Sequence, residues 1–170
     1  MHEKQVAKIL LETKAVSLRT NPPYTWTSGI LSPIYTDNRI LISFPKEREQ
    51  IVDFLIDLIE KNKIKADVIA GTATAGIPWA AFIAQKMKKP MVYVKKEAKE
   101  YGKEKQIEGQ LEKGVEVVVV EDLISTGGSS LQAVQALRDA GCIVNNCVAI
   151  FTYQMKKSDD AFLEKKCKNH

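Results

Sequence analysis

The chain has 170 residues, of which 45% are hydrophobic and 27% are charged, and this balance is typical of one globular domain. Its net charge of +4 is small and spread along the chain, whereas a nucleic-acid-binding surface usually carries a clustered basic stripe. No apolar run approaches the roughly 20 residues that span a bilayer, and the three cysteines lack the CxxC spacing of a zinc site. We therefore expect a single cytoplasmic domain over residues 1–170, with no nucleic acid or membrane as partner.

Helices and strands are expected to alternate along most of the chain. A first helix is predicted over 3–14, and the Pro-, Gly- and aromatic-rich region 17–41 suggests short strands joined by turns. Pro45 opens an amphipathic helix over 45–62. The later elements are strands at 67–71, 90–94, 115–120 and 144–153, with helices at 77–88 and from about 129 to Gly141. Such alternation predicts βαβ crossovers and an α/β fold with a mostly parallel sheet.

The stretch VVVVEDLISTGGSS, residues 117–130, carries the strongest chemical signal. Its valines predict a buried parallel strand, and ligands in such sheets bind beyond the carboxyl ends of the strands, where Glu121 and Asp122 stand. The loop that follows is rich in glycine and hydroxyl groups and leads into a helix N-terminus, which favours phosphate binding. Acids beside a phosphate suit a ligand that also offers ribose hydroxyls or a bound cation. The alternative is a loop that only caps the helix, with Asp122 and Ser125 as turn residues.

This stretch resembles the ribose-phosphate motif of type I phosphoribosyltransferases, which use 5-phosphoribosyl 1-diphosphate (PRPP). Three further stretches resemble motifs of the orotate phosphoribosyltransferases within that family. They are YTWTSGILSPIYTDNR (24–39), GTATAGIPWAA (71–81) and YVKKEAKEYGKEKQIEG (93–109). All four lie in the family's order and spacing, so the resemblance extends to about Tyr153.

The resemblance implies a fold, a reaction and an assembly. The fold would be the type I phosphoribosyltransferase fold: a mostly parallel central sheet flanked by helices, a small N-terminal hood over about 1–44 and a mobile lid over about 95–109. The reaction would transfer 5-phosphoribosyl from PRPP to orotate, giving orotidine 5′-phosphate and pyrophosphate in pyrimidine (UMP) biosynthesis. Mg²⁺ would be held mainly through the substrate rather than by a protein metal site. The protein would be a homodimer whose lid is shared across subunits.

The resemblance also implies roles for individual residues. Lys99 and Asp122 are the catalytic candidates. PRPP contacts are implied for Lys95, Lys96, Lys99, Tyr101, Glu121, Asp122, Leu123, Ile124, Ser125, Thr126, Gly127, Gly128 and Ser129. Among these, Glu121 and Asp122 would contact ribose hydroxyls and Ser125–Ser129 would wrap the 5′-phosphate. The pyrophosphate loop would include Thr74 and Ala75, and orotate would be bound by Ser28, Gly29, Arg39 and Ser125.

Some residues depart from the family pattern or have a simpler interpretation. Lys95 stands where relatives usually have arginine, Tyr101 where they have histidine and Thr27 where many have lysine, and relatives usually continue beyond residue 170. Arg39 could equally form a structural salt bridge, GTATAG could be a tightly packed turn, and residues 95–109 could be a solvated surface. Two other functions stay open at this point: a purine-type phosphoribosyltransferase and a non-catalytic PRPP-binding regulator.

Overall fold

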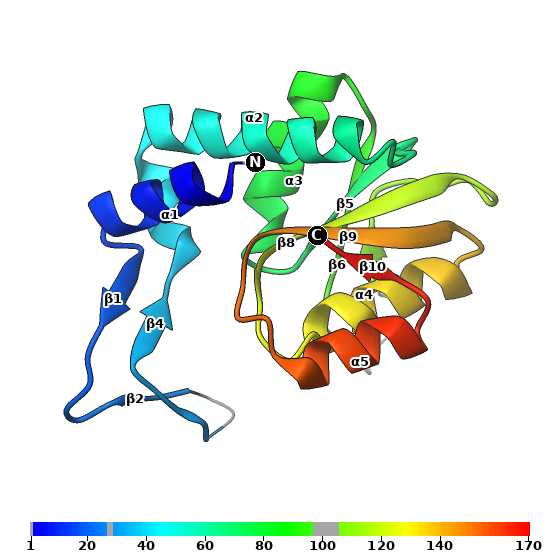
Figure 1. The fold of residues 1–170 in the computed structure, drawn as a ribbon. Coiled ribbons are helices and arrows are strands. Elements are labelled where there is room, and N and C mark those ends of the chain that lie inside the picture. Colours follow the sequence, from blue (N-terminus) through cyan, green and yellow to red (C-terminus); the bar gives the residue numbers. More distant parts are fainter. Residues whose placement is uncertain (1, 27–28, 97–105) are drawn as a thin grey trace. The chain divides into compact units, whose positions relative to one another are not determined.

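The computed structural model describes residues 2–26, 29–96 and 106–170 (Figure 1). The chain divides into two compact units, Met1–Ile51 and Val52–His170, and each is described by itself. Within the described ranges, no helix combines the length and the apolar character that crossing a membrane would require.

The N-terminal unit is built from short elements. Helix α1 (Glu3–Glu12) is followed by strands β1 (Val16–Leu18), β2 (Tyr24–Thr25), β3 (Leu31–Ser32) and β4 (Ile34–Thr36), the 3₁₀ helix η1 (Asn38–Ser43) and the start of α2 (Pro45–Lys61). Strand β1 pairs with β4 and β2 with β3, both antiparallel. The predicted short strands in this region are therefore confirmed.

The C-terminal unit contains a six-stranded sheet in the order β10-β9-β8-β5-β6-β7. Its strands are β5 (Val68–Thr72), β6 (Met91–Val94), β7 (Ile107–Glu108), β8 (Glu116–Ile124), β9 (Ile143–Thr152) and β10 (Lys168–Asn169), and its further helices are α3 (Gly76–Met87), α4 (Gly128–Asp139) and α5 (Lys156–Glu164). All neighbouring strands are parallel except β6 and β7. The predicted α/β class with a mostly parallel sheet is confirmed.

The two main crossovers leave the middle of the sheet in opposite directions. The chain passes from β5 through α3 to β6 on one side, and from β8 through α4 to β9 on the other. Because parallel crossovers are right-handed, this reversal places α3 and α4 on opposite faces. It also makes the neighbouring strands β5 and β8 the topological switch point, where ligands of open α/β sheets bind.

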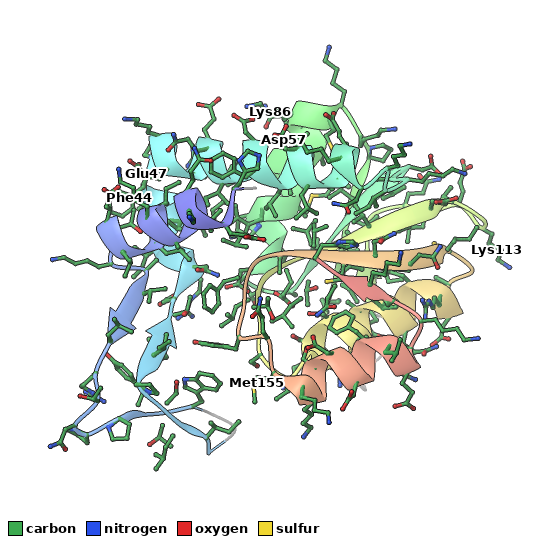
Figure 2. The ribbon with its side chains drawn as sticks, viewed as in Figure 1. Phe44, Glu47, Asp57, Lys86, Lys113 and Met155 are labelled. Carbon is green, nitrogen blue, oxygen red and sulfur yellow. The ribbon has the colours of Figure 1, made fainter. Side chains whose placement is uncertain are left out.

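Strand β8 is buried because helices cover both of its faces. Val117, Val118, Val119 and Val120 are each at most 2% exposed. On the outer side of α3, the Lys86 ammonium (labelled in Figure 2) lies 2.6 Å from the Asp53 carboxylate of α2. The pairing of β5 with β8 as far as Gly71 opposite Val120 places the ends of the two strands beside each other.

The structure differs from the sequence prediction at three places. Strand β8 continues through the acidic pair to Ile124 instead of ending at Val120, because β9 remains paired with it as far as Thr152. Residues 107–108, predicted as part of a polar loop, form β7 against β6. The segment after Tyr153, for which no element was predicted, forms α5, which follows Met155 (Figure 2), and β10.

Candidate active site

Glu121 and Asp122 lie just beyond the part of β8 that pairs with β5. Strand β5 pairs with β8 only as far as Gly71 opposite Val120, whereas β9 pairs onward with Glu121 opposite Ala149. From Glu121 onward, β8 therefore has a neighbouring strand on one side only. This open side at the carboxyl end of β5 is the place where the sequence predicted a ligand.

Glu121 is directed into the protein, since only 4% of the residue is exposed. One carboxylate oxygen accepts the backbone N–H of Asp122 at 3.2 Å, and the other accepts the hydroxyls of Ser129 and Ser130, each at 3.2 Å. Burial and then the neighbouring Asp122 charge raise the pKa of Glu121 from 4.5 to about 8. Asp122 itself is partly exposed. The two adjacent acids thus have different environments.

The hydroxyl-rich loop is shaped by Gly127 and ends at the first turn of α4. Gly127 has a φ of +80°, a left-handed conformation that glycine adopts without steric cost, and its carbonyl accepts the N–H of Leu131 at 2.9 Å. A Cβ on Gly127 would lie 2.9 Å from the Phe162 ring and 3.2 Å from the Ser158 hydroxyl of α5. Nothing lies within 4 Å of such an atom on Gly128. The loop is therefore supported by α5 on one side and is open beside Gly128. Gly128 is the first residue of α4, and the free backbone N–H groups at a helix N-terminus favour binding of an anion.

The residues before Ser125 contribute to the site in different ways. Ile124 is 1% exposed, and its carbonyl accepts the N–H of Tyr153 at 3.1 Å, so its side chain belongs to the core. Leu123, Ser125 and Thr126 are partly buried. Of the predicted phosphate-loop residues, Ser125, Thr126 and Gly127 form the turn between β8 and α4, and Gly128 and Ser129 begin α4.

The second predicted loop, residues 72–76, leaves β5 beside the first. The Ala73 N–H donates to the Val94 carbonyl at 2.9 Å, and the Ala73–Thr74 peptide bond is cis. A Cβ on Gly76 would overlap the carbonyl oxygen of Val120, and one on Gly71 would lie 2.9 Å from the Ile77 backbone. The tight-packing interpretation therefore accounts for both glycines of GTATAG. Of the predicted pyrophosphate-loop residues between these glycines, Thr74 is exposed and Ala75 is partly buried.

A pocket of about 40 Å³ lies between the first turns of α4 and the ends of β5 and β6. It is lined by Thr72, Ala73, Val94, Lys95, Lys96, Ser129, Gln132 and Ala133. The buried Thr72 hydroxyl has no hydrogen-bond partner within the described ranges. Lys95 Nζ lies 2.8 Å from Glu108 Oε1 of β7. Two lysines, of which Lys95 is paired with Glu108, and the Thr72 hydroxyl line one pocket, and such groups suit an anionic ligand group.

Thr72 and Gln132 were not predicted as site residues. Gln132 follows Ser129 by three positions in α4, a spacing that places two side chains on the same side of a helix. That spacing could have indicated Gln132. Thr72 ends a strand predicted only as far as Gly71, and its place in the pocket depends on how β5 and α4 pack.

Of the predicted orotate-binding residues, Ser125 lies in the turn after β8, Gly29 and Arg39 lie in the N-terminal unit, and Ser28 lies outside the described residues. Gly29 has a φ of +82°, and its N–H donates to the Trp26 carbonyl at 2.8 Å. The Arg39 guanidinium binds both carboxylate oxygens of Asp37, at 2.6 and 2.8 Å, and lowers the pKa of Asp37. The salt bridge considered as the simpler interpretation of Arg39 is thus present. Ser28, Lys99 and Tyr101 lie outside the described residues.

The chain is similar to known proteins in both sequence and fold. A sequence model of the phosphoribosyl transferase domain matches residues 44–170. The orotate phosphoribosyltransferase of Staphylococcus saprophyticus is 56% identical over 159 residues, which are 94% of this chain and 78% of that protein. The orotate phosphoribosyltransferase of Listeria innocua is 59% identical over 155 residues, 91% and 74% of the two chains. The crystal structure of orotate phosphoribosyltransferase from Aeropyrum pernix matches with a TM-score of 0.85 at 30% identity, covering 96% of this chain and 90% of that one.

Proposed function

Because this chain belongs to the orotate phosphoribosyltransferase family, we propose that it transfers the 5-phosphoribosyl group of PRPP to N1 of orotate. The products are orotidine 5′-phosphate and pyrophosphate, and the reaction is a step of pyrimidine biosynthesis. The fold is the type I phosphoribosyltransferase fold, with its six-stranded sheet flanked by helices. The enzyme is accordingly a pentosyltransferase.

The observation that carries this proposal is the pocket between the first turn of α4 and the end of β5, at the switch point. The first turn of α4, which follows the loop after β8, and the end of β5 with its following loop border one pocket, to which Ser129 and Thr72 contribute from the two sides. PRPP has a phosphate at each end of its ribose, so it needs two anion sites with hydroxyl-binding groups between them. In the proposed complex, the N-terminal turn of α4 holds the 5′-phosphate and Asp122 contacts the ribose.

The diphosphate is proposed to lie on the β5 side, where Thr74 and Ala75 face it. Lys95 and Lys96 line the same pocket and supply positive charge as the bond from C1′ to the diphosphate oxygen breaks. Orotate supplies its own nucleophilic nitrogen, so no side chain needs to attack C1′. The chain's residues then act by orientation and by stabilising the developing charge.

Mg²⁺ fits this site as a partner of the substrate. Among residues 2–26, 29–96 and 106–170, no group of three or more His, Cys, Asp or Glu side chains could hold a metal ion. Magnesium is commonly held by one or two carboxylates together with substrate phosphates, and the partly exposed Asp122 can provide such a carboxylate. When bound, the ion would neutralise charge on the diphosphate.

The family resemblance supplies the rest of the proposal. Lys99 is the lysine proposed to contact the diphosphate, from a lid that completes the neighbouring subunit's site in a homodimer. Tyr101 can donate a hydrogen bond at neutral pH but does not carry the charge available to histidine. Ser28, Gly29, Arg39 and Ser125 remain the proposed orotate contacts. To bind Arg39, the orotate carboxylate would have to displace the Asp37 carboxylate or join the ion pair that Asp37 forms with Arg39.

A chromatographic assay tests the function directly. Purified protein is incubated with PRPP, Mg²⁺ and either orotate or adenine, and the nucleotide products are separated. Orotidine 5′-phosphate from orotate alone is the expected result. Adenosine 5′-phosphate formed instead would make the protein a purine-type enzyme. PRPP binding with neither product would make it a regulator.

A further inference from the structure

We propose that Glu108 is a positioning residue for Lys95, because it holds the Lys95 ammonium at the pocket before an anionic ligand arrives. This inference rests on the proposed function, in which Lys95 supplies positive charge to the diphosphate, and it deepens that function. It also assigns a role to β7, a strand that was not predicted from the sequence.

The pairing of β6 with β7 places Lys95 and Glu108 on the same face of the two strands. Tyr93 of β6 lies opposite Glu108 of β7. Two positions after Tyr93, the Lys95 N–H donates to the Gln106 carbonyl at 2.9 Å, so the pairing continues beyond the end of β6. Lys95 and Glu108 are therefore diagonal neighbours across the pair, at a separation that long side chains can span.

Contacts from this strand pair hold both the backbone and the side chain of Lys95. Lys95 Nζ lies 2.8 Å from Glu108 Oε1, and the Gln106 side-chain amide donates to the Lys95 carbonyl at 3.2 Å. Glu108 is not among the residues that line the pocket, so its carboxylate does not occupy the space of a ligand. Because an ammonium group has three N–H donors, a hydrogen bond to Glu108 leaves donors for an anion.

An anchored lysine binds an anion at a lower entropic cost than a lysine that must first be immobilised. The negative charge of Glu108 acts in the opposite direction, since it lowers the positive potential at the pocket. This second effect is screened by water, because the Lys95 side chain is 27% exposed and the Glu108 side chain is 44% exposed. We therefore expect the ordering of Lys95 to decide the net effect of Glu108 on anion binding.

Inorganic pyrophosphate and ribose 5-phosphate separate this role from a general effect on the fold. Ribose 5-phosphate is titrated calorimetrically into full-length wild type and variants. Pyrophosphate with Mg²⁺ is then titrated at saturating ribose 5-phosphate, which occupies the phosphate site proposed at α4. Glu108→Ala should weaken pyrophosphate binding by about 2–10-fold, the effect of ordering one long side chain, and leave ribose 5-phosphate binding unchanged.

Three further variants distinguish the position of the carboxylate from its charge. Glu108→Gln keeps an oxygen acceptor for the ammonium and should bind pyrophosphate about as well as the wild type. Glu108→Asp keeps the charge on a shorter side chain and should weaken pyrophosphate binding. Glu112→Ala removes an exposed carboxylate between β7 and β8 and is the control for net charge, with wild-type binding expected.

A double mutant tests whether Glu108 acts through Lys95. Lys95→Ala should itself weaken pyrophosphate binding, and adding Glu108→Ala should cause no further loss, because both substitutions remove one interaction. The proposal is overturned if the effect of Glu108→Ala persists in the Lys95→Ala background. It is also overturned if Glu108→Ala alone strengthens pyrophosphate binding, leaves it unchanged, or weakens both ligands equally.

Two remaining outcomes are also decisive. Should Glu108→Ala fail to fold, Glu108→Asp takes its place: weaker pyrophosphate binding supports the positioning role, and wild-type binding overturns it. If the wild type binds pyrophosphate but forms no orotidine 5′-phosphate, the proposed reaction fails and the role of Glu108 stands. A wild type that binds no pyrophosphate would overturn the role of Glu108.

Discussion

Gly76 at the start of α3 lies directly against the carbonyl group of Val120 in β8, so closely that a Cβ on Gly76 would overlap the carbonyl oxygen. The contact joins the loop proposed for the diphosphate to the strand that carries the acidic pair. It also explains why the alternative interpretation of GTATAG as a packing turn and its proposed ligand role are compatible. The glycine packs, and the residues before it are the ones proposed to face the ligand.

Gly76→Ala should therefore destabilise the protein by about 1–3 kcal/mol, the usual cost of forcing extra volume into a packed site. Gly128→Ala is the matched control, because nothing lies within 4 Å of its added methyl group and alanine favours the helix. Urea unfolding followed by circular dichroism measures both. Equal stability of the two variants would contradict the packing role assigned to Gly76.

The pH dependence of stability should carry a contribution from Glu121. Its pKa is raised from 4.5 to about 8 in the folded protein, so the folded state holds a proton that the unfolded state has released. The stabilisation is complete below about pH 4.5 and is lost as the pH rises through about 8. The groups that face Glu121 are Asp122 on its own strand, the hydroxyls of Ser129 and Ser130, and the Cys147 thiol of β9.

Glu121→Gln lacks this titration and is the comparison for that prediction. From pH 6 to pH 9, the melting temperature of the wild type should fall further than that of Glu121→Gln, with about 2–4 °C for each kcal/mol lost. Differential scanning fluorimetry at several pH values measures the two curves. Parallel curves would mean that Glu121 already ionises in its ordinary range.

The fold was predictable largely because its main signals are local. Valine-rich strands, amphipathic helices and the left-handed Gly141 at the end of α4 all lie within short windows of the sequence. Helix α5 gave a weaker signal, since its only buried side chains are Ser158 and Phe162. Burial of a serine has no signature in a hydrophobicity pattern, and it depends here on the neighbouring Gly127.

The location of the acidic pair was predictable, whereas the different environments of its two members were not. Two adjacent carboxylates look equivalent in sequence, and their difference arises from the hydroxyls of Ser129 and Ser130, which follow eight and nine positions after Glu121. The pocket position of Thr72 likewise results from tertiary packing. Such relations appear only when the crossovers bring β5, β8 and α4 together.

Arg138 should hold the unpredicted C-terminal segment in place. Its guanidinium donates to the carbonyls of Val144, Lys165 and Lys166, which joins α4 to the start of β9 and the end of α5. Arg138→Lys keeps the charge but loses the planar fork, so we expect a loss of about 1–3 kcal/mol in the free energy of unfolding. Lys165→Ala is the control, because it removes a side chain and leaves the carbonyl acceptor. If both variants unfold at the same urea concentration, the hydrogen bonds of the Arg138 guanidinium do not stabilise the position of α5.

Lys99→Ala should lower the turnover number by about 10²–10³-fold, since it removes a charge proposed to stabilise the departing diphosphate. Lys157→Ala, a change at an exposed position of α5, is the control for a general effect of removing a lysine. Initial rates of orotidine 5′-phosphate formation at saturating PRPP measure both variants, and melting temperatures should stay at the wild-type value. Wild-type turnover in Lys99→Ala would exclude this lysine from the reaction.

Subunit mixing should reveal whether the lid completes the partner's site. Lys99→Ala and Asp122→Asn each impair both sites of a homodimer, but a mixed dimer would combine the intact lid of one subunit with the intact ribose site of the other. Co-expression with random pairing should then restore about a quarter of the wild-type sites, because half of the dimers are mixed and each has one complete site. Separately purified variants, assayed without subunit exchange, provide the baseline. If co-expression restores no activity although mixed dimers are isolated by two affinity tags, each lid serves its own subunit.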